Sequence, residues 1–173
     1  MAQIEKSFKA LYEKSLHPQG RLEFWSEWAD KIHWFKNYNK VLDDSNPPFY
    51  RWFTGGETNA GYNAIDRHVE NGLANSPALH YESAYTGDVK TYSFKEAQTE
   101  IAKLARVISD QGVKKGDRVI IYMPMIPQAY FAIHACIRIG AVHSVVFGGF
   151  ASEELASRIK HADAKLIITA SCG

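Results

Sequence analysis

The second half of the chain alternates between helical segments and short apolar runs, and this alternation limits the fold more than any other feature. The apolar runs cover residues 119–123, 142–147 and 166–169, and each has the length expected for a buried strand. Residues 127–140 and 152–161, which separate the runs, carry apolar residues at helical spacing. Strands joined by helices through short connections predict parallel pairing by crossover units. We therefore expect an α/β fold with a doubly wound, mostly parallel sheet and helices on both faces.

Turn and capping residues support this alternation. Ser93 and Glu96 form the capping-box pattern, which predicts the start of a helix just before the first buried strand. Pro127 suits the first position of the next helix, and Gly140 suits the position just after its end. Upstream of Ser93, two short strand-like runs joined by turn-forming residues predict a hairpin over residues 78–92.

Residues 1–76 are expected to form a helical, aromatic-rich region, distinct from the α/β region over residues 77–173. Twelve of the 22 aromatic residues lie within the first 53 positions. Apolar spacing predicts helices near residues 4–12 and 22–32, and another over residues 59–72 that ends at a glycine. The aromatic stripe could hold a flat ligand, but packing is the more frequent use of such residues.

The composition excludes several classes of protein. Twenty basic and 19 acidic side chains give a formal net charge of +1, whereas nucleic-acid binding draws on concentrated positive charge. The apolar runs are far shorter than a membrane span, and the N-terminus does not resemble a secretory signal. Two cysteines do not make a disulfide framework in a chain this long. We expect no nucleic-acid or membrane partner, and a cytoplasmic location, with the mitochondrion as the alternative if a transit peptide precedes this sequence.

The candidate sites are the segments that follow the parallel strands, because ligands of open α/β sheets bind outside the carboxyl ends of the strands. After the first strand, residues 124–128 present Gln128 and the start of a helix. After the second strand come Gly148 and Gly149, which lack Cβ atoms and allow a ligand or another backbone to approach closely. This pair fits neither the GxGxxG dinucleotide pattern nor the phosphate-loop pattern. From the pattern alone, a ligand contact and a plain strand-to-helix turn are equally supported.

Other polar residues are expected to have structural roles. Asp66, Arg67 and His68 adjoin one another without a nucleophile, which favours an ion-paired anchor over a catalytic triad. His134 is expected to be a hydrogen-bonded histidine near the core, and Cys136 a small apolar packing residue. No His or Cys spacing matches a metal site, and Cys172 has no nearby cation to activate its thiol. We therefore predict no catalytic residue and no metal ligand in this chain.

Several segments together resemble one family. The segments VIIYMPMIP (residues 119–127) and ACIRIGAVHSVVFGGF (residues 135–150) resemble the short-chain acyl-CoA synthetases, which are the acetyl- and propionyl-CoA synthetases of the adenylate-forming superfamily. The segments RWFTGGETN (residues 51–59) and YNAIDRH (residues 62–68) are similar to the N-terminal region of the same family. The resemblance spans nearly the whole chain and implies that the α/β region is part of the large N-terminal domain of such an enzyme.

This resemblance implies a two-step ligase with ATP, Mg²⁺ and CoA as cofactors. A carboxylate attacks ATP to give an acyl-adenylate and pyrophosphate, and CoA then displaces AMP to form the thioester. Phe147, Gly148 and Gly149 match the family positions that line the CoA nucleotide pocket, so the resemblance favours the ligand contact at this glycine pair. The family's phosphate loop, ribose-binding aspartate and mobile lysine-bearing domain have no counterpart in this sequence and are expected beyond residue 173. No catalytic residue is therefore carried over.

The implied substrate is a short-chain carboxylic acid. Gln128 and residues 147–152 look more similar to the propionyl-CoA branch than to the acetyl-CoA branch, so propionate is the first expectation and acetate the second. The remainder of the same chain is the expected protein partner, and a homo-oligomer is compatible with the sequence. We predict that the 173 residues alone are inactive. The alternative is a non-catalytic α/β module that docks on a partner protein.

Overall fold

The computed structural model describes residues 2–171, with side chains from residue 7 onward, and the chain forms two compact units that divide between Thr58 and Asn59. The boundary expected from the sequence lies later, after residue 76, where the strand-like pattern begins. Residues 59–76 belong instead with the second unit, because their helical turns pack against the helix over Phe94–Asp110.

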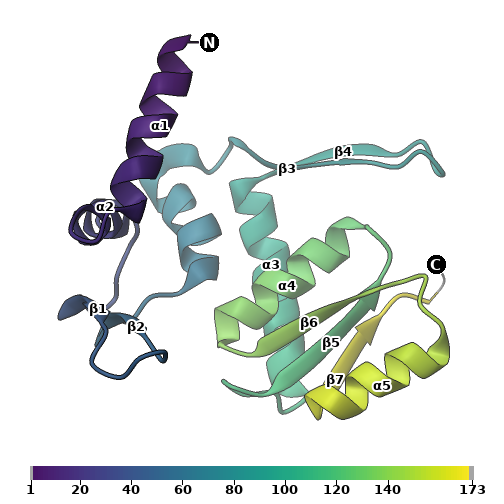
Figure 1. The fold of residues 1–173 in the computed structure, drawn as a ribbon. Helices are drawn as coiled ribbons and strands as arrows, with labels where there is room; N and C mark the ends of the chain where they lie inside the picture. The colour runs from purple at the N-terminus through teal and green to yellow at the C-terminus, as the bar shows by residue number, and fades with distance from the viewer. Residues whose placement is uncertain (1, 172–173) are drawn as a thin grey trace. The chain divides into compact units, whose positions relative to one another are not determined.

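The first unit contains two helices and a two-stranded sheet (Figure 1). Helix α1 covers Ala2–Leu16 and helix α2 covers Gly20–Ala29, which confirms the two predicted N-terminal helices, although Ile32 lies beyond the end of α2. Strands β1 (Lys40–Asp43) and β2 (Arg51–Thr54) pair antiparallel. The sequence analysis did not predict this hairpin.

Aromatic side chains form the packing of this first unit. The rings of Trp25 and Trp52 meet edge to face with their centroids 6.0 Å apart, which joins α2 to β2. Trp34 contacts the rings of Tyr38 and Phe53, and its Nε1 donates a hydrogen bond to the carbonyl of Ala29 at 2.9 Å. The stripe contributes to this packing, although Trp25 and Trp28 remain 41% and 44% exposed.

The second unit begins with a helical segment over residues 60–73, close to the range predicted for it. Its turns are wider than those of an α-helix, with π-helical geometry in η1 (Tyr62–Asp66) and η2 (Val69–Leu73). Gly72 has a φ of +86°, a left-handed conformation that glycine adopts at low cost. This conformation breaks the helix in its last turn and confirms the predicted helix end.

The predicted hairpin and capping box are both present. Strands β3 (Pro77–Glu82) and β4 (Val89–Ser93) pair antiparallel, and β4 leads directly into helix α3 (Phe94–Asp110). The Ser93 hydroxyl accepts a hydrogen bond from the backbone N–H of Glu96, while the Glu96 carboxylate accepts one from the backbone N–H of Ser93 at 2.8 Å. Two N–H groups that the first turn of α3 cannot satisfy are thereby paired.

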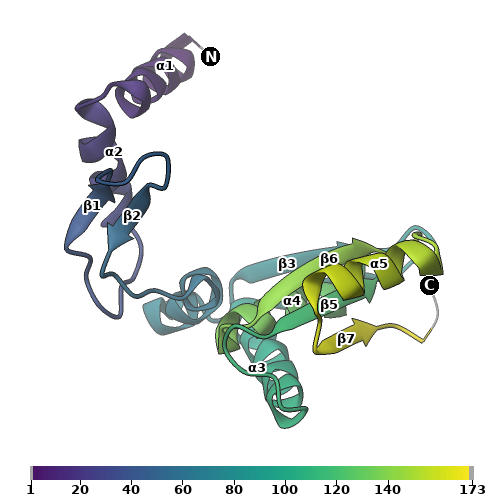
Figure 2. The same ribbon diagram turned by 60° about the horizontal axis from the view of Figure 1, so that its bottom comes forward.

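A three-stranded parallel sheet completes the second unit (Figure 1). Its strands are β5 (Arg118–Met123), β6 (Val142–Phe147) and β7 (Leu166–Thr169), in the order β6-β5-β7. Helix α4 (Pro127–Ile139) joins β5 to β6, and helix α5 (Ser152–Ala162) joins β6 to β7. The two crossovers run in opposite directions along the sheet, so right-handed connections place α4 and α5 on opposite faces, as Figure 2 shows. The expected doubly wound α/β fold is confirmed.

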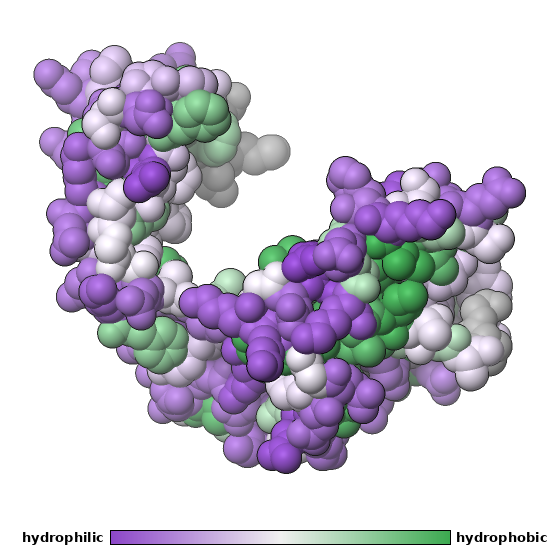
Figure 3. Space-filling model, turned by 90° about the horizontal axis from the view of Figure 1, so that it is seen from below, coloured by the Kyte–Doolittle hydropathy of each residue, from purple (hydrophilic) through white to green (hydrophobic). Residues whose placement is uncertain are grey.

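The core lies between this sheet and helices α3 and α4. Val119 and Ile121 of the central strand are fully buried in a cluster with Ile101 and Ile108 of α3, while Ile120 is buried on the other face. Strand β6 was expected to be buried, and this expectation was wrong for most of the strand. Val142 and Val145 are about half exposed, because β6 is at an edge of the described sheet, and apolar side chains of the second unit reach the surface (Figure 3).

Candidate functional site

The candidate site lies where strands β5 and β6 end side by side, with Met123 of β5 paired to Phe147 of β6. The chain then turns toward α4 on one face after β5, and toward α5 on the other face after β6. Adjacent strands whose helices lie on opposite faces form the crevice where ligands of open α/β sheets bind. We call residues Phe147–Phe150, which leave β6 at this crevice, the glycine loop. It contains the three residues that the sequence analysis singled out: Phe147, Gly148 and Gly149.

Tyr122 of the central strand binds the glycine loop through its hydroxyl group. Its phenolic oxygen lies 3.0 Å from the carbonyl oxygen of Gly148 and 2.8 Å from that of Phe150, so its one proton can be shared between the two acceptors. A third hydrogen bond closes the loop on itself, from the N–H of Phe150 to the carbonyl of Phe147 at 3.1 Å. The sequence analysis missed Tyr122. The signal that could have found it is a hydroxyl on an otherwise apolar strand, at the end where ligands bind.

At Gly148 a side chain would be tight for space, whereas the backbone conformation does not call for glycine. A Cβ atom built on it would lie 3.3 Å from the carbonyl oxygen of Met123 and 3.4 Å from the backbone nitrogen of Pro124. Gly148 and Gly149 are not among the glycines with positive φ. The close approach at Gly148 is therefore made by the backbone that follows β5. The sequence analysis expected either a ligand or another backbone to approach this glycine pair.

Gly149 leaves room for the ring of Phe147. A Cβ atom on Gly149 would lie 2.7 Å from Cε1 of Phe147, closer than real Cβ contacts come. The Phe147 side chain is 69% exposed and meets the ring of Phe150 edge to face, with centroids 5.8 Å apart. The guanidinium of Arg158, from α5, lies 5.1 Å from the centroid of the Phe150 ring. The loop thus presents an exposed aromatic ring that a second ring supports.

This arrangement suits binding rather than proton transfer. The loop offers an aromatic face and backbone polar groups, which can stack against a flat ring and hydrogen-bond to its edge. Arg158 is the cation beside the loop, and it is already paired with Glu154 at 2.9 Å. The chemistry that the loop can supply is recognition of a planar ligand.

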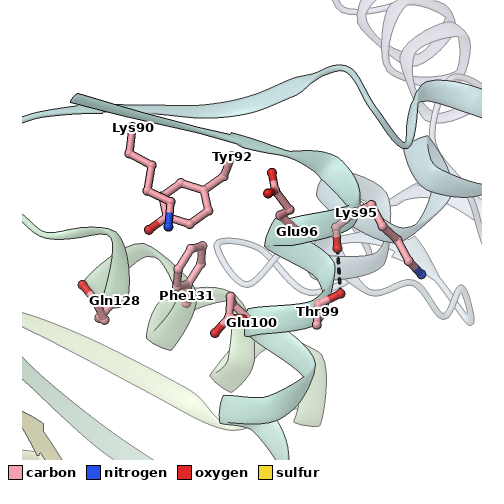
Figure 4. A pocket seen from close by; sticks show the side chains of 8 residues that line it. All are labelled: Lys90, Tyr92, Lys95, Glu96, Thr99, Glu100, Gln128 and Phe131. Carbon is pink, nitrogen blue, oxygen red and sulfur yellow. Dashed lines mark hydrogen bonds between the residues drawn. The ribbon is translucent and has the colours of Figure 1, made fainter. Parts of the chain in front are cut away.

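Gln128 lines a pocket that contains no residue of the glycine loop. This pocket, of about 450 Å³, lies between β4, α3 and the start of α4 (Figure 4), and its lining residues are Lys90, Tyr92, Lys95, Glu96, Thr99, Glu100, Gln128 and Phe131. Its charged groups already have partners. Lys90 lies over the ring of Tyr92, Lys95 donates to Gln98, and Glu96 belongs to the capping box. The two lysines and two glutamates also balance in formal charge.

The predicted ion-paired anchor is present, but its cation comes from elsewhere in the chain. Asp66 is buried, with 6% of its surface exposed, and it pairs with Arg138 of α4 rather than with the adjacent Arg67. Arg67 donates to the side-chain oxygen of Asn63, one helical turn earlier. The anchor therefore connects η1 with α4, which a sequence pattern of neighbours cannot indicate.

His134 and Cys136 lie on α4, as predicted, but only the cysteine behaves as predicted. Cys136 is fully buried, and burial raises the pKa of its thiol to about 11. His134 was expected to be hydrogen-bonded, and this was wrong. Its buried Nδ1 has no hydrogen-bond partner among the described residues, and its ring packs against Tyr130 at a centroid distance of 4.4 Å. Burial, and next the proximity of His143, lowers the pKa of His134. Cys172 lies outside the described residues.

The described residues supply no obvious cation site. Within residues 7–171, no three His, Cys, Asp or Glu side chains come together in a way that could hold a metal ion. None of the described helices is long and apolar enough to cross a membrane.

Comparison with known proteins gives a consistent match along the chain. Residues 8–64 match the family model described as the acetyl-coenzyme A synthetase N-terminus, and residues 65–172 match the model of the AMP-binding enzymes. The chain is 52% identical over 150 residues to the mitochondrial acyl-CoA synthetase short-chain family member 3 of Rattus norvegicus, an alignment that covers 87% of this chain and 22% of the relative. The corresponding protein of Homo sapiens is 49% identical over the same shares. An acetyl-coenzyme A synthetase of Streptomyces avermitilis is 50% identical over 153 residues, which is 88% of this chain and 23% of that enzyme.

The chain spans less than a quarter of the length of these curated relatives. The AMP-binding match alone covers more than half of the 173 residues, and it includes the whole parallel sheet and the glycine loop. This chain therefore belongs to the family of AMP-binding enzymes, with the N-terminal segment typical of acetyl-coenzyme A synthetases.

Proposed function

We propose that this chain is the N-terminal part of an AMP-forming short-chain acyl-CoA synthetase. The observation that carries the proposal is the unbroken succession of two family matches, over residues 8–64 and 65–172. Identities of about 50% to proteins named as acyl-CoA and acetyl-CoA synthetases support it. In the reaction, a carboxylate oxygen attacks the α-phosphorus of ATP and pyrophosphate leaves. The sulfur of CoA then attacks the acyl carbon, and AMP leaves.

The glycine loop is the part of this chain that we assign to CoA. Phe147, Gly148 and Gly149 correspond by resemblance to positions that line the CoA nucleotide pocket. An exposed phenylalanine ring at the ligand-binding edge of the sheet supports this role, because aromatic side chains stack on nucleobases whatever the base. ATP and Mg²⁺ are proposed to bind elsewhere in the protein, because the family's phosphate loop has no counterpart in this sequence.

The substrate is proposed to be a short-chain carboxylic acid, with propionate preferred over acetate. The test is acid-dependent release of pyrophosphate from ATP by the complete synthetase, over acetate, propionate and butyrate. We expect the highest kcat/KM with propionate. A higher kcat/KM with acetate would overturn the preference, and release that does not depend on an added acid would overturn the proposed function. The 173-residue chain alone is expected to release no pyrophosphate above background.

A non-catalytic module that docks on a partner protein is the alternative. The gene sequence after the codon for residue 173 discriminates between the two. A continuing reading frame that encodes a phosphate loop rich in Ser, Thr, Gly and Lys supports the synthetase, whereas a stop codon supports the module. We propose a cytoplasmic location, or a mitochondrial one, as the names of the mammalian relatives suggest. Cell fractionation checks this proposal.

A further inference from the structure

We infer that Tyr122 is a positioning residue for the CoA nucleotide, which it serves by holding the glycine loop so that the Phe147 ring stays in place. This inference rests on the proposed function, because it concerns the same loop. Tyr122 lies on the neighbouring strand, and only the three-dimensional structure brings it to the loop.

Tyr122 occupies a rigid position. It lies on β5, the central strand, where it pairs with Val146 on one side and Thr169 on the other. Val119, Ile120 and Ile121, which precede it, are fully buried. A hydroxyl on such a strand has a fixed location, so it can fix the position of whatever it binds.

The glycine loop has few other means of support. Two of its four residues are glycines without side chains, and Ala151, which follows the loop at the start of α5, provides no side-chain cap for this helix. Phe147 ends β6 and pairs there with Met123; beyond this pairing, the described contacts that bind the loop to the sheet are the Tyr122 hydroxyl on two carbonyls and the backbone approach at Gly148. Removing the hydroxyl therefore leaves the loop carbonyls without their partner in the sheet.

Loss of the Tyr122 hydroxyl would affect the Phe147 ring through Phe150. The carbonyl that Tyr122 binds most closely is that of Phe150, at 2.8 Å, and the ring of Phe150 supports the ring of Phe147. Phe147 is mostly exposed, so few other contacts restrict its ring. Movement of Phe150 would thus change the ring that is proposed to stack on the nucleotide, while the buried core stays intact.

The test is a double-mutant cycle in the complete synthetase, with KM for CoA, KM for ATP and kcat measured for each variant. Tyr122→Phe removes only the hydroxyl. We expect it to raise the KM for CoA about three- to tenfold, the range for one lost hydrogen bond, and to leave KM for ATP within about twofold. Phe147→Ala should raise the KM for CoA by about tenfold, because base stacking is lost. In the Phe147→Ala background, Tyr122→Phe should have no further effect, since its route of action is gone.

Tyr130→Phe is the matched control, because it removes a hydroxyl from α4, where the ring packs on Phe131 and His134, and should change neither KM. Thermal unfolding shows whether each variant keeps its fold. Effects of Tyr122→Phe and Phe147→Ala that multiply in full, equal increases of both KM values, or an unchanged KM for CoA in Tyr122→Phe would each overturn the inference. An unchanged KM for CoA in Phe147→Ala would instead overturn the assignment of the loop to CoA. The two failures are therefore distinguishable.

Discussion

The carboxylate of Asp66 accepts two hydrogen bonds from Nη1 of Arg138, at 2.8 and 2.7 Å, and a third from Nε2 of Gln98 at 2.9 Å. These bonds connect η1, α3 and α4 at the place where the three elements pack together. Asn59 adds a fourth connection, because its side-chain amide donates to the carbonyl of Ile137 in the last turn of α4. A buried carboxylate thus organises the beginning of the second unit.

Loss of the Arg138 guanidinium, which pairs with Asp66, should destabilise the protein. Arg138→Ala leaves the buried carboxylate of Asp66 with Gln98 as its remaining side-chain donor. We expect the free energy of unfolding to fall by about 2–3 kcal/mol. This loss is at or below the low end of the range for breaking a buried ion pair, because Arg138 is partly exposed. Urea unfolding measures this change. Arg106→Ala, which breaks the exposed pair with Asp110 on α3, is the control and should have no measurable effect. Equal stability of the two variants would contradict the anchoring role of Asp66.

His134 should make stability depend on pH. Its pKa is lowered from the ordinary 6.5, by burial and then by His143, so the unfolded chain takes up a proton more readily than the folded chain. The contribution is fully present above pH 6.5, and stability decreases as the pH drops below this value toward the folded-state pKa. Urea unfolding between pH 7.5 and about 5.5 should show this decrease. His134→Leu, which also removes the unpartnered Nδ1, should reduce the slope, and the remainder is expected from His143, whose pKa is also lowered by burial. An unchanged slope would argue against a buried neutral histidine at this position.

Cys136 should be inert toward thiol reagents in the folded protein. Its pKa of about 11 leaves roughly one thiolate in a thousand at pH 8, and the side chain is fully buried. The experiment uses the 173-residue chain with the Cys172→Ser substitution, so that Cys136 is the single thiol counted. We expect no reaction with Ellman's reagent before unfolding, and one thiol per chain in urea. Fast reaction of the folded protein would mean that the interior around α4 is open to solvent.

Local sequence signals predicted most elements of the second unit. The Ser93–Glu96 box, Pro127 at the start of α4 and Gly140 after its end each act within one helical turn, and the structure confirms all three. Such signals depend on the backbone of neighbouring residues, so a sequence displays them directly.

Features that depend on tertiary contacts could not be predicted in this way. Arg138 lies 72 positions from Asp66, and Tyr122 lies 26 positions from Gly148, so neither pairing has a sequence pattern. The burial of β6 depends on the strand order, which an alternation of helices and strands does not specify. For the site, the pattern pointed to the glycine pair and the family resemblance to all three loop residues, whereas the contacts of Tyr122, Phe150 and Arg158 required coordinates.

The most direct test of the account is the effect of Gly149→Trp on the complete synthetase. A Cβ atom at Gly149 already collides with the Phe147 ring, so an indole there should displace the ring and fill the proposed nucleotide site. We predict a rise of about tenfold or more in the KM for CoA, with the KM for ATP within about twofold of the unmodified enzyme. Equal increases of both KM values would contradict the account, because they would mean that the glycine loop only maintains the fold.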